Sequence, residues 1–419
     1  MSSAVNNQNL KDDLELLAKK AFALYKSVIN HYPVANDPFQ TVAIIVQLEA
    51  ELKQIDEFQT CVDIMNADET ISPLLGKMVG TIVRRSTTES ADTCVTRFIE
   101  RLYHASQDKA FDSAFFHDQY EAFEELFYSD QLRFLDTVRL HNFDSEVDEI
   151  GLEDGLAIKK LPLIQDDRTT IEEAEYRPHV QFSRSDFVME RRYIKPKLVG
   201  NSTTKPSPEQ LTKELNESDN VFDLVITALR ILKPSAVYRD HSITTKTLTF
   251  LPYGGGGSRF PLVENIVLGN KCVVSSEEAA ELKTLYTKMK QAKHQPFTIA
   301  SNRLGFGMER RSDEDRLLDY MIGLESLYLP DGNDELTFRL SLRVAFVTRQ
   351  EMAERKHMFK FIRKMYGVRS NIAHGGKKYE LTKEDISQIE EVLRKSLKIY
   401  LDKPANFSRE TLDNIYFEG

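Results

Sequence analysis

Apolar residues in the first third of the chain recur at the spacing of amphipathic helices. Between Leu14 and Val28 the apolar positions are three or four residues apart, so they share one face of a helix. Looser patterns of the same kind cover residues 42–52, 74–83, 95–102 and 115–135. We therefore expect residues 1–137 to form a mostly helical N-terminal region.

The chain after residue 137 is richer in residues that favour strands. Thr, Val, Phe and Tyr are frequent in 180–193 and 243–251, whereas 221–232 has the spacing of a helix. A Ser/Thr/Pro cluster at 201–208 is typical of an exposed loop. We expect residues 138–275 to form a strand-bearing middle domain.

Helical patterns return in the last third of the chain. Two serines followed by two glutamates at 275–278 are typical of a helix start, and the helix that follows should connect the middle domain to the last domain over 276–295. The segment 311–329 carries apolar residues on a wide face, which predicts a buried helix.

Glu325 falls on the apolar face of that buried helix. A carboxylate buried without a partner is unfavourable, so we expect an ion pair with Arg339 or Arg343, the nearest candidate cations in the sequence. A structural role for this pair is favoured over a catalytic one.

Three further segments complete the C-terminal part. Residues 336–346 alternate between apolar and polar, which slightly favours a strand, although the same apolar residues also satisfy helical spacing. Residues 352–373 predict a helix that stops before a pair of glycines. Thr382 and Asp385 have the spacing of a capping box, which predicts the start of a last helix.

The composition is that of a folded, soluble protein: 41% of the 419 residues are hydrophobic and 29% are charged. The cysteines Cys61, Cys94 and Cys272 form no C-x-x-C pair, so neither a disulfide framework nor a common zinc site is indicated. No cationic leader and no apolar stretch of about 18 residues is present. We expect a cytoplasmic protein without a membrane partner.

Common cofactor motifs are missing from the sequence. Four glycines at 254–257 follow a strand candidate, but no Lys-Ser or Lys-Thr follows them, so the phosphate-binding P-loop pattern fails. No dinucleotide fingerprint, nucleophile elbow or metal-ligand cluster occurs either. We expect neither a cofactor nor a metal.

The charge is distributed unevenly along the chain. The formal net charge is -10, which disfavours binding of nucleic acid by the molecule as a whole. Residues 354–378, however, hold eight basic residues against Glu354 alone, a net charge of +7, which leaves -17 for the remainder. This stretch is either an ordinary solvated helix face or a footprint for a polyanion.

Arg369 and His374 lie inside this basic stretch as an R-x4-H string. Such a string is weak evidence alone, and Arg97 with His104 forms a second match, R-x6-H, which we interpret as a surface pair on a helix. The setting of Arg369 distinguishes the two matches. Within about 110 residues the chain presents, in order, MIGLESLYL (321–329), FRLSLRVAFV (338–347), MYGVRSNIAHG (365–375) and a closing amphipathic helix.

This order of phrases resembles the Apea-like branch of the HEPN domains over residues 296–403. The resemblance implies an all-helical bundle, and with it a helix rather than a strand at 336–346. The fold class expected is then a multidomain α+β protein with the following parts: a helical N-terminal region (1–137), a strand-bearing middle domain (138–275), a connecting helix (276–295), a HEPN helical bundle (296–403) and a C-terminal tail (404–419).

HEPN domains commonly use an R-x4-to-6-H motif to cleave RNA without a metal, usually within a dimer. The matching residues here are Arg369 and His374, which the resemblance implies to be catalytic. Ser370 and Asn371 follow the arginine, where many family members carry Asn, Asp or His. We expect RNA binding to be supported by Ser370, Asn371, Lys356, Lys360, Arg363, Lys364, Lys377 and Lys378.

The residue types suit that chemistry. Metal-free RNA cleavage needs a group that titrates near neutral pH to move the proton of the 2′-hydroxyl or of the leaving oxygen, and histidine is that side chain. It also needs a fixed cation at the phosphate, for which the arginine fork is well shaped. One histidine per chain performs half of this acid–base work, so a homodimer that pairs two copies is expected.

The leading functional hypothesis is an endoribonuclease that leaves a 2′,3′-cyclic phosphate. The resemblance of 140–143, 155–161 and 227–233 to larger Apea-like proteins implies antiphage defence or a toxin-like effector, with residues 1–295 answering a phage-derived or cellular trigger. The alternatives are a non-catalytic RNA-binding or protein-docking HEPN module, and an unrelated enzyme with its site in the middle domain.

Overall fold

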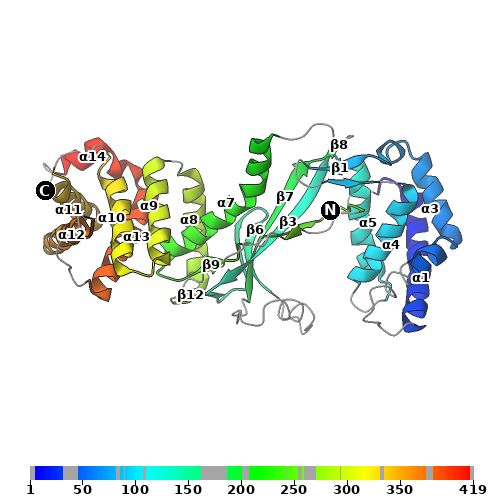
Figure 1. The fold of residues 1–419 in the computed structure, drawn as a ribbon, viewed down its shortest axis with the longest axis horizontal. Helices are drawn as coiled ribbons and strands as arrows, with labels where there is room; N and C mark the ends of the chain where they lie inside the picture. The colour runs from blue at the N-terminus through cyan, green and yellow to red at the C-terminus, as the bar shows by residue number, and fades with distance from the viewer. Residues whose placement is uncertain are drawn as a thin grey trace. The chain divides into compact units, whose positions relative to one another are not determined.

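The computed structural model describes residues 5–31, 46–81, 85–88, 90–106, 110–161, 186–200, 207–241, 243–252, 257–258, 270–292, 294–330, 335–373 and 381–415. The described chain is mostly helical, with small sheets in its middle region (Figure 1). It divides into two compact units. Unit 1 comprises residues 1–136, 191–217 and 244–258, and unit 2 comprises residues 137–190, 218–243 and 259–419.

The border after Asp136 lies next to the end expected for the N-terminal region. The residues expected to form one middle domain, 138–275, are instead divided between the two units. Each unit has its own hydrophobic core.

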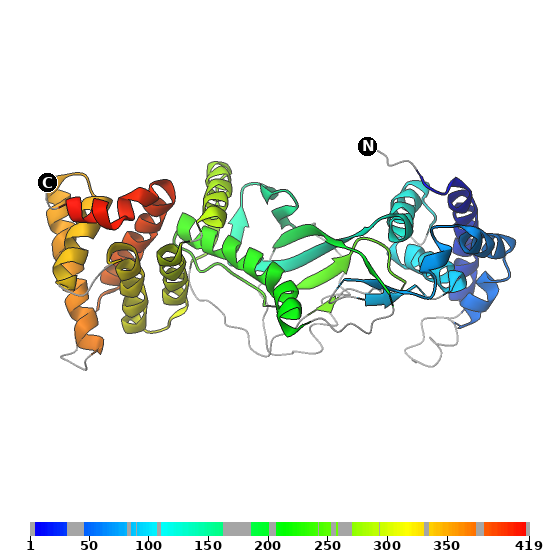
Figure 2. The ribbon, with the colours of Figure 1, turned by 90° about the horizontal axis from the view of Figure 1, so that it is seen from above.

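Helices form most of the described part of unit 1 (Figures 1 and 2). They include α1 (Gln8–His31), α3 (Asp56–Ala67), α4 (Ala91–Ala105) and α5 (Ser113–Tyr128), residues 46–52 are helical as well, and the 3-10 helix η1 (Ser72–Leu74) follows α3. Ser90 and Asp112 cap α4 and α5 by accepting a hydrogen bond from a backbone amide in the first turn. The apolar stripe predicted from Leu14 onward faces the core, since Leu14, Leu17 and Ala21 are fully buried.

Two helices expected in unit 1 are wrong in part. Of the predicted segment 74–83, the described residues 74–81 contain the end of η1 and the strand β1 (Met78–Gly80) rather than a helix, and residues 82–83 lie outside the described residues. The pattern over 115–135 belongs to two elements, because α5 ends at Tyr128 and the strand β3 (Gln131–His141) begins three residues later. Burial alternates along β3, so Leu132, Phe134 and Val138 share one face.

The sheets of unit 1 are small. β1 lies between β2 (Arg85–Thr87) and β8 (Leu198–Val199), and both pairs are antiparallel. A second sheet has the order β11-β10-β3-β7-β6-β5, in which β11 (Gly257–Ser258), β10 (Thr244–Thr247) and parts of β3 and β7 (Phe187–Pro196) belong to unit 1. Strands are thus present at 243–251 and at the described end of 180–193, as predicted.

Unit 2 contains strands as well as helices. β5 (Glu149–Glu153) and β6 (Leu156–Lys160) form an antiparallel pair, β9 (Tyr238–Arg239) pairs with β3, and β12 (Cys272–Val274) runs parallel to β4 (Phe143–Ser145). The helix predicted at 221–232 is the C-terminal half of α7 (Pro208–Leu232). Phe222, Val225 and Leu229 are fully buried on one face of it.

The C-terminal part of unit 2 is a helical bundle. Its helices are α8 (Ser276–Gln291), α9 (Gln295–Glu309), α10 (Asp313–Tyr328), α11 (Leu336–Thr348), α12 (Met352–Ala373), α13 (Lys383–Asp402), η2 (Pro404–Phe407) and α14 (Arg409–Asn414). Capping boxes open α8 at Ser275 and α13 at Thr382, as predicted. In the bundle α10 packs against α9 and α13, while α11 packs against α12.

The strand favoured by alternation at 336–346 is wrong, and the helix implied by the family resemblance is present as α11. The buried residues Leu340, Val344 and Thr348 recur every four positions and face the core. Phe338, which belongs to the alternating set, stays 45% exposed. Packing against α12 therefore selects the helical stripe over the alternating one.

Described residues of the predicted helix 276–295 and of the tail 404–419 contribute to the core of unit 2. Leu282, Leu285 and Met289 of α8 are buried in the same cluster as the bundle helices. Phe407 and Leu412 of the tail lie in that cluster too. α8 therefore packs as part of the bundle.

None of the described helices is long and apolar enough to span a bilayer.

Candidate functional site

Helix α12 positions the predicted arginine Arg369. Met358, Ile362, Met365 and Val368 recur at helical spacing and are buried, so this face of α12 packs on the core. Arg369 lies one helical turn after Met365 on the same face, and its side chain is 27% exposed. The guanidinium therefore remains within reach of solvent while its stem is held by packing.

Arg369 is paired with Glu325 of α10. Its Nη2 lies 3.4 Å from Glu325 Oε2, a long contact between two partly buried groups. The guanidinium also lies 5.7 Å from the centre of the Tyr366 ring, one helical turn earlier on α12. These three side chains form the Arg369 site.

The charges within the Arg369 site do not fully compensate for the burial of its ionisable groups. Burial raises the pKa of the Glu325 carboxyl, and the nearby Arg369 cation compensates only in part. Burial also raises the pKa of Tyr366, with a smaller contribution from the negative charge of Glu325. Glu325 Oε1 and Arg369 Nε are buried and have no hydrogen-bond partner among the described residues. These two atoms could therefore form hydrogen bonds to a polar group of a ligand.

Several exposed basic residues lie on α12 on the N-terminal side of Arg369. Lys356, Lys360 and Arg363 are exposed and make no ion pair or hydrogen bond with any residue in the described ranges. We call these three residues the basic row. Lys364 is also exposed, but its ammonium binds Asp385 at 3.0 Å. Three of the four predicted helix cations are therefore available to a polyanion.

The remaining predicted site residues have different outcomes. Ser370 is half-buried beside Arg369, and Asn371 is exposed on the last turn of α12. His374, Lys377 and Lys378 lie outside the described residues.

The predicted partner of Glu325 is wrong. Arg343 and Arg339 of α11 pair instead with Asp413 of the tail, with closest N–O distances of 2.5 and 3.8 Å. Glu325 pairs with Arg369, which is 44 residues away in the sequence. Proximity in sequence suggested the first choice, whereas the packing of α10 against α12 determines the second.

The second Arg–His match has the surface setting that was expected. Both residues lie on α4, where Arg97 pairs with Glu100 at 2.6 Å and His104 is exposed in the last turn. This site makes a suitable control for the first match.

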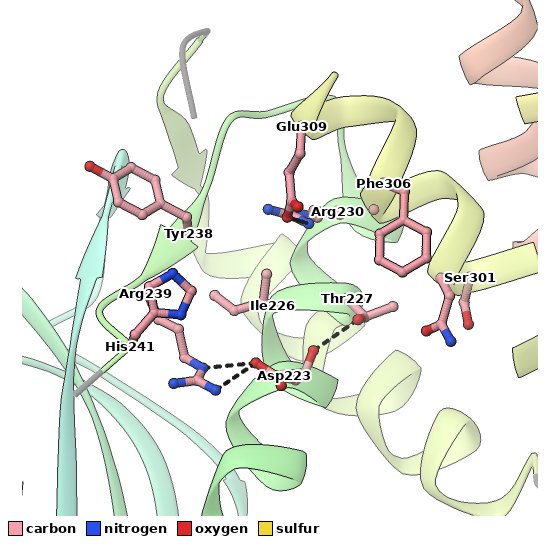
Figure 3. A pocket seen from close by; sticks show the side chains of 12 residues that line it. Asp223, Ile226, Thr227, Arg230, Tyr238, Arg239, His241, Ser301, Phe306 and Glu309 are labelled. Carbon is pink, nitrogen blue, oxygen red and sulfur yellow. Dashed lines mark hydrogen bonds and ion pairs between the residues drawn. The ribbon is translucent and has the colours of Figure 1, made fainter. Parts of the chain in front are cut away.

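A pocket of about 270 Å³ lies elsewhere in unit 2, between α7, β9 and α9 (Figure 3). Its wall includes Arg230, Arg239, His241, Asn302 and Phe306. Sequence analysis missed these residues because they come from three separate segments that share no motif. The 48% exposure of Phe306 on α9 is visible only in the structure, so the sequence offered no signal for this pocket.

Neither site contains a recognisable metal centre. Within the described ranges, no group of three His, Cys, Asp or Glu side chains could hold a metal ion. All three cysteines are buried, and burial raises the pKa of the Cys61 thiol to about 12, so that thiol is poorly reactive.

No protein-family model, no curated protein and no solved structure matches this chain.

Proposed function

We propose that the protein is an Apea-like HEPN endoribonuclease that cleaves RNA without a metal and leaves a 2′,3′-cyclic phosphate. The observation that supports this best is the shared helix of Arg369 and the basic row. The row is exposed and makes no ion pair or hydrogen bond within the described residues, and Arg369 lies further along α12 on another face, with a buried Nε that has no described partner. Cations exposed on one face of a helix suit a phosphodiester backbone.

Arg369 would contact the scissile phosphate. Its guanidinium can donate two parallel hydrogen bonds to phosphate oxygens and stabilise the charge of the pentacoordinate transition state. Glu325 competes with the phosphate for this cation, but burial already disfavours the ionised form of Glu325. We therefore treat Glu325 as a positioning residue that orients Arg369 and is readily displaced by a stronger anion.

His374 would move the protons. In the first half of the reaction the 2′-oxygen attacks phosphorus and loses its proton, while the 5′-oxygen leaves and gains one. One imidazole serves one of these transfers, so a second copy of the chain in a homodimer would supply the other. Two basic rows would then flank one RNA. A cytoplasmic antiphage or toxin-like effector, answering a phage-derived or cellular trigger, is the biological setting proposed.

The test is RNA cleavage in EDTA. Total RNA is incubated with the wild-type protein and with Arg369→Ala, His374→Ala and His104→Ala, and the new ends are mapped and tested for a cyclic phosphate. We expect cleavage by the wild type and by His104→Ala, and at least a hundredfold loss in the other two variants. Equal cleavage by all four proteins, or none by the wild type with any trigger, would refute the proposal.

A non-catalytic RNA-binding or protein-docking module is the second candidate. The Arg369–Glu325 pair favours it, because the pair joins α10 to α12 and a mainly structural arginine would make this contact too. This candidate predicts RNA binding that survives His374→Ala and weakens with salt. RNA that binds to the wild-type protein but is not cleaved by it would support this second candidate.

A further inference from the structure

The pocket between α7, β9 and α9 is a second candidate site in unit 2, and Arg369 is not part of its wall. The lining combines two arginines, two carboxylates, aromatic rings and small polar side chains. Its volume of about 270 Å³ is near the lower end for small-molecule sites, so its ligand is small. The lining groups that already have hydrogen-bond partners indicate which class of ligand the pocket can bind.

Each guanidinium nitrogen of the two arginines of the pocket already donates a hydrogen bond to the protein. Arg230 Nη1 donates to Glu309 at 2.8 Å, while its Nε and Nη2 donate to the carbonyl of Val237. Arg239 donates to Asp223 and Asp219 at 2.8 and 2.9 Å and to the carbonyl of Asp240. A phosphate or carboxylate ligand would have to displace protein carboxylates here, so the pocket disfavours an anion.

Three other lining groups have unused binding capacity. Phe306 is 48% exposed, and although Arg303 lies 5.8 Å from its ring centre, much of the ring remains accessible. Asn302 and His241 are exposed and make no hydrogen bond to a described residue. Figure 3 shows Phe306 and His241 on opposite sides of the pocket, with Ile226 and Thr227 between them.

We infer that this pocket binds a nucleobase. A nucleobase is flat, neutral and aromatic, so it can stack on Phe306 without disturbing the arginine–carboxylate pairs. The carboxamide of Asn302 offers a donor and an acceptor side by side, the pattern that pairs with the edge of an adenine. The apolar floor at Ile226 would contact the ring plane. A lipid chain offers no hydrogen-bonding group to Asn302, and a saturated sugar lacks the flat aromatic face that stacks on Phe306.

The base can come from a free nucleotide or from an unpaired position of an RNA strand, because both present the same ring. The inference does not rest on RNA cleavage, since it concerns binding by residues outside the Arg369 site. It predicts that Phe306 and Asn302 determine affinity for the base whether or not the protein is a nuclease.

The experiment measures binding of two probes to the full chain by calorimetry and fluorescence anisotropy. The probes are adenosine 5′-monophosphate and a labelled ten-nucleotide oligoadenylate RNA. We expect at least one probe to bind, Phe306→Ala to weaken that binding about tenfold or more, and Phe306→Tyr to restore it. Asn302→Ala should weaken it as well. Phe338→Ala removes a similarly exposed phenylalanine, 45% exposed on α11, and should have no effect.

The outcomes separate the sources and the proposals. Binding of the mononucleotide assigns the pocket to a free nucleotide, and Phe306-dependent binding of the RNA alone assigns it to an unpaired RNA base. If neither probe binds, or if Phe306→Ala and Asn302→Ala bind like the wild type, the inference is wrong. RNA binding that falls when the basic row is changed to glutamine but not in Phe306→Ala also overturns it, while leaving the proposed nuclease intact.

Discussion

Arg343 of α11 and Asp413 of the C-terminal tail form an ion pair in which the arginine is completely buried. Arg343 Nη2 donates to Asp413 Oδ1 at 2.5 Å, and its Nη1 donates to the carbonyl of Tyr328 at 2.7 Å. Tyr328 is the last residue of α10, where carbonyls have no amide partner within the helix. One guanidinium therefore connects the end of α10 to the tail.

We expect Asp413→Ala to destabilise unit 2. The substitution leaves the buried Arg343 cation without its carboxylate, and the loss should be about 1 to 3 kcal/mol because Asp413 itself is 43% exposed. Asp402→Ala is the matched control, since Asp402 pairs with Lys288 where both side chains are exposed, and its effect should be below about 1 kcal/mol. The free energy of unfolding in urea measures both. Equal losses in the two variants would contradict the structural role of the tail.

Two glycines of the bundle should respond to alanine in opposite directions. A Cβ at Gly307 of α9 would lie 2.2 Å from a ring carbon of Tyr320, so Gly307→Ala forces the buried ring to move and should cost about 1 to 3 kcal/mol. A Cβ at Gly367 of α12 meets nothing within 4 Å, so Gly367→Ala should stabilise by up to about 1 kcal/mol through helix propensity. Urea unfolding midpoints report both signs. Stabilisation by Gly307→Ala would mean that α9 and α10 do not pack as described.

Local signals in the sequence predicted most helices but fewer of their contacts. The capping boxes at Ser275 and Thr382 act within one turn, so sequence alone identifies them. At 336–346 two periodicities coexist, and contact with α12 decides between them. The strand at Met78–Gly80 owes its conformation to pairing with β2 and with β8, and β8 lies too far along the chain to leave a local trace.

The residues of the candidate site were also predicted from the sequence only in part. Sequence identified Arg369 and the basic row because a single helix contains them. It assigned Glu325 to the wrong cation, since the partner depends on which helices pack together. The pocket between α7, β9 and α9 was not predicted, because His241, Asn302 and Phe306 come to line one pocket only through the packing of these elements.

The stability contributed by Glu325 should depend on pH. Burial raises the pKa of this carboxyl above its ordinary value of 4.5, so the folded protein holds the proton to a higher pH than the unfolded chain does. Stability is therefore fully present below about pH 4.5, the pKa of the unfolded chain, and is lost as the pH rises from there through the raised pKa of the folded protein. Glu325→Gln removes this titration, so the variant should gain stability relative to the wild type between pH 4 and pH 7.

Urea unfolding of the wild type and Glu325→Gln at pH 4, 5.5 and 7 measures this effect. Glu384→Gln serves as the control, because Glu384 is exposed in the first turn of α13. Its difference from the wild type should change little over this range. A difference between Glu325→Gln and the wild type that stays constant from pH 4 to pH 7 would show that Glu325 is not buried as described.

The basic row should set the salt dependence of RNA binding. Lys356, Lys360 and Arg363 are exposed and unpaired within the described chain, so each can release a counterion when it meets a phosphate. Changing all three to glutamine should weaken binding of a single-stranded RNA and reduce the slope of log affinity against log salt by about 2, at about 0.7 per contact. The control changes Lys19, Lys20 and Lys26 of α1 to glutamine, which removes the same charge from unit 1, where Lys19 and Lys20 already bind Glu15 and Glu57. An unchanged slope in the α12 variant, or the same change in both variants, would show that the overall charge rather than this helix governs RNA binding.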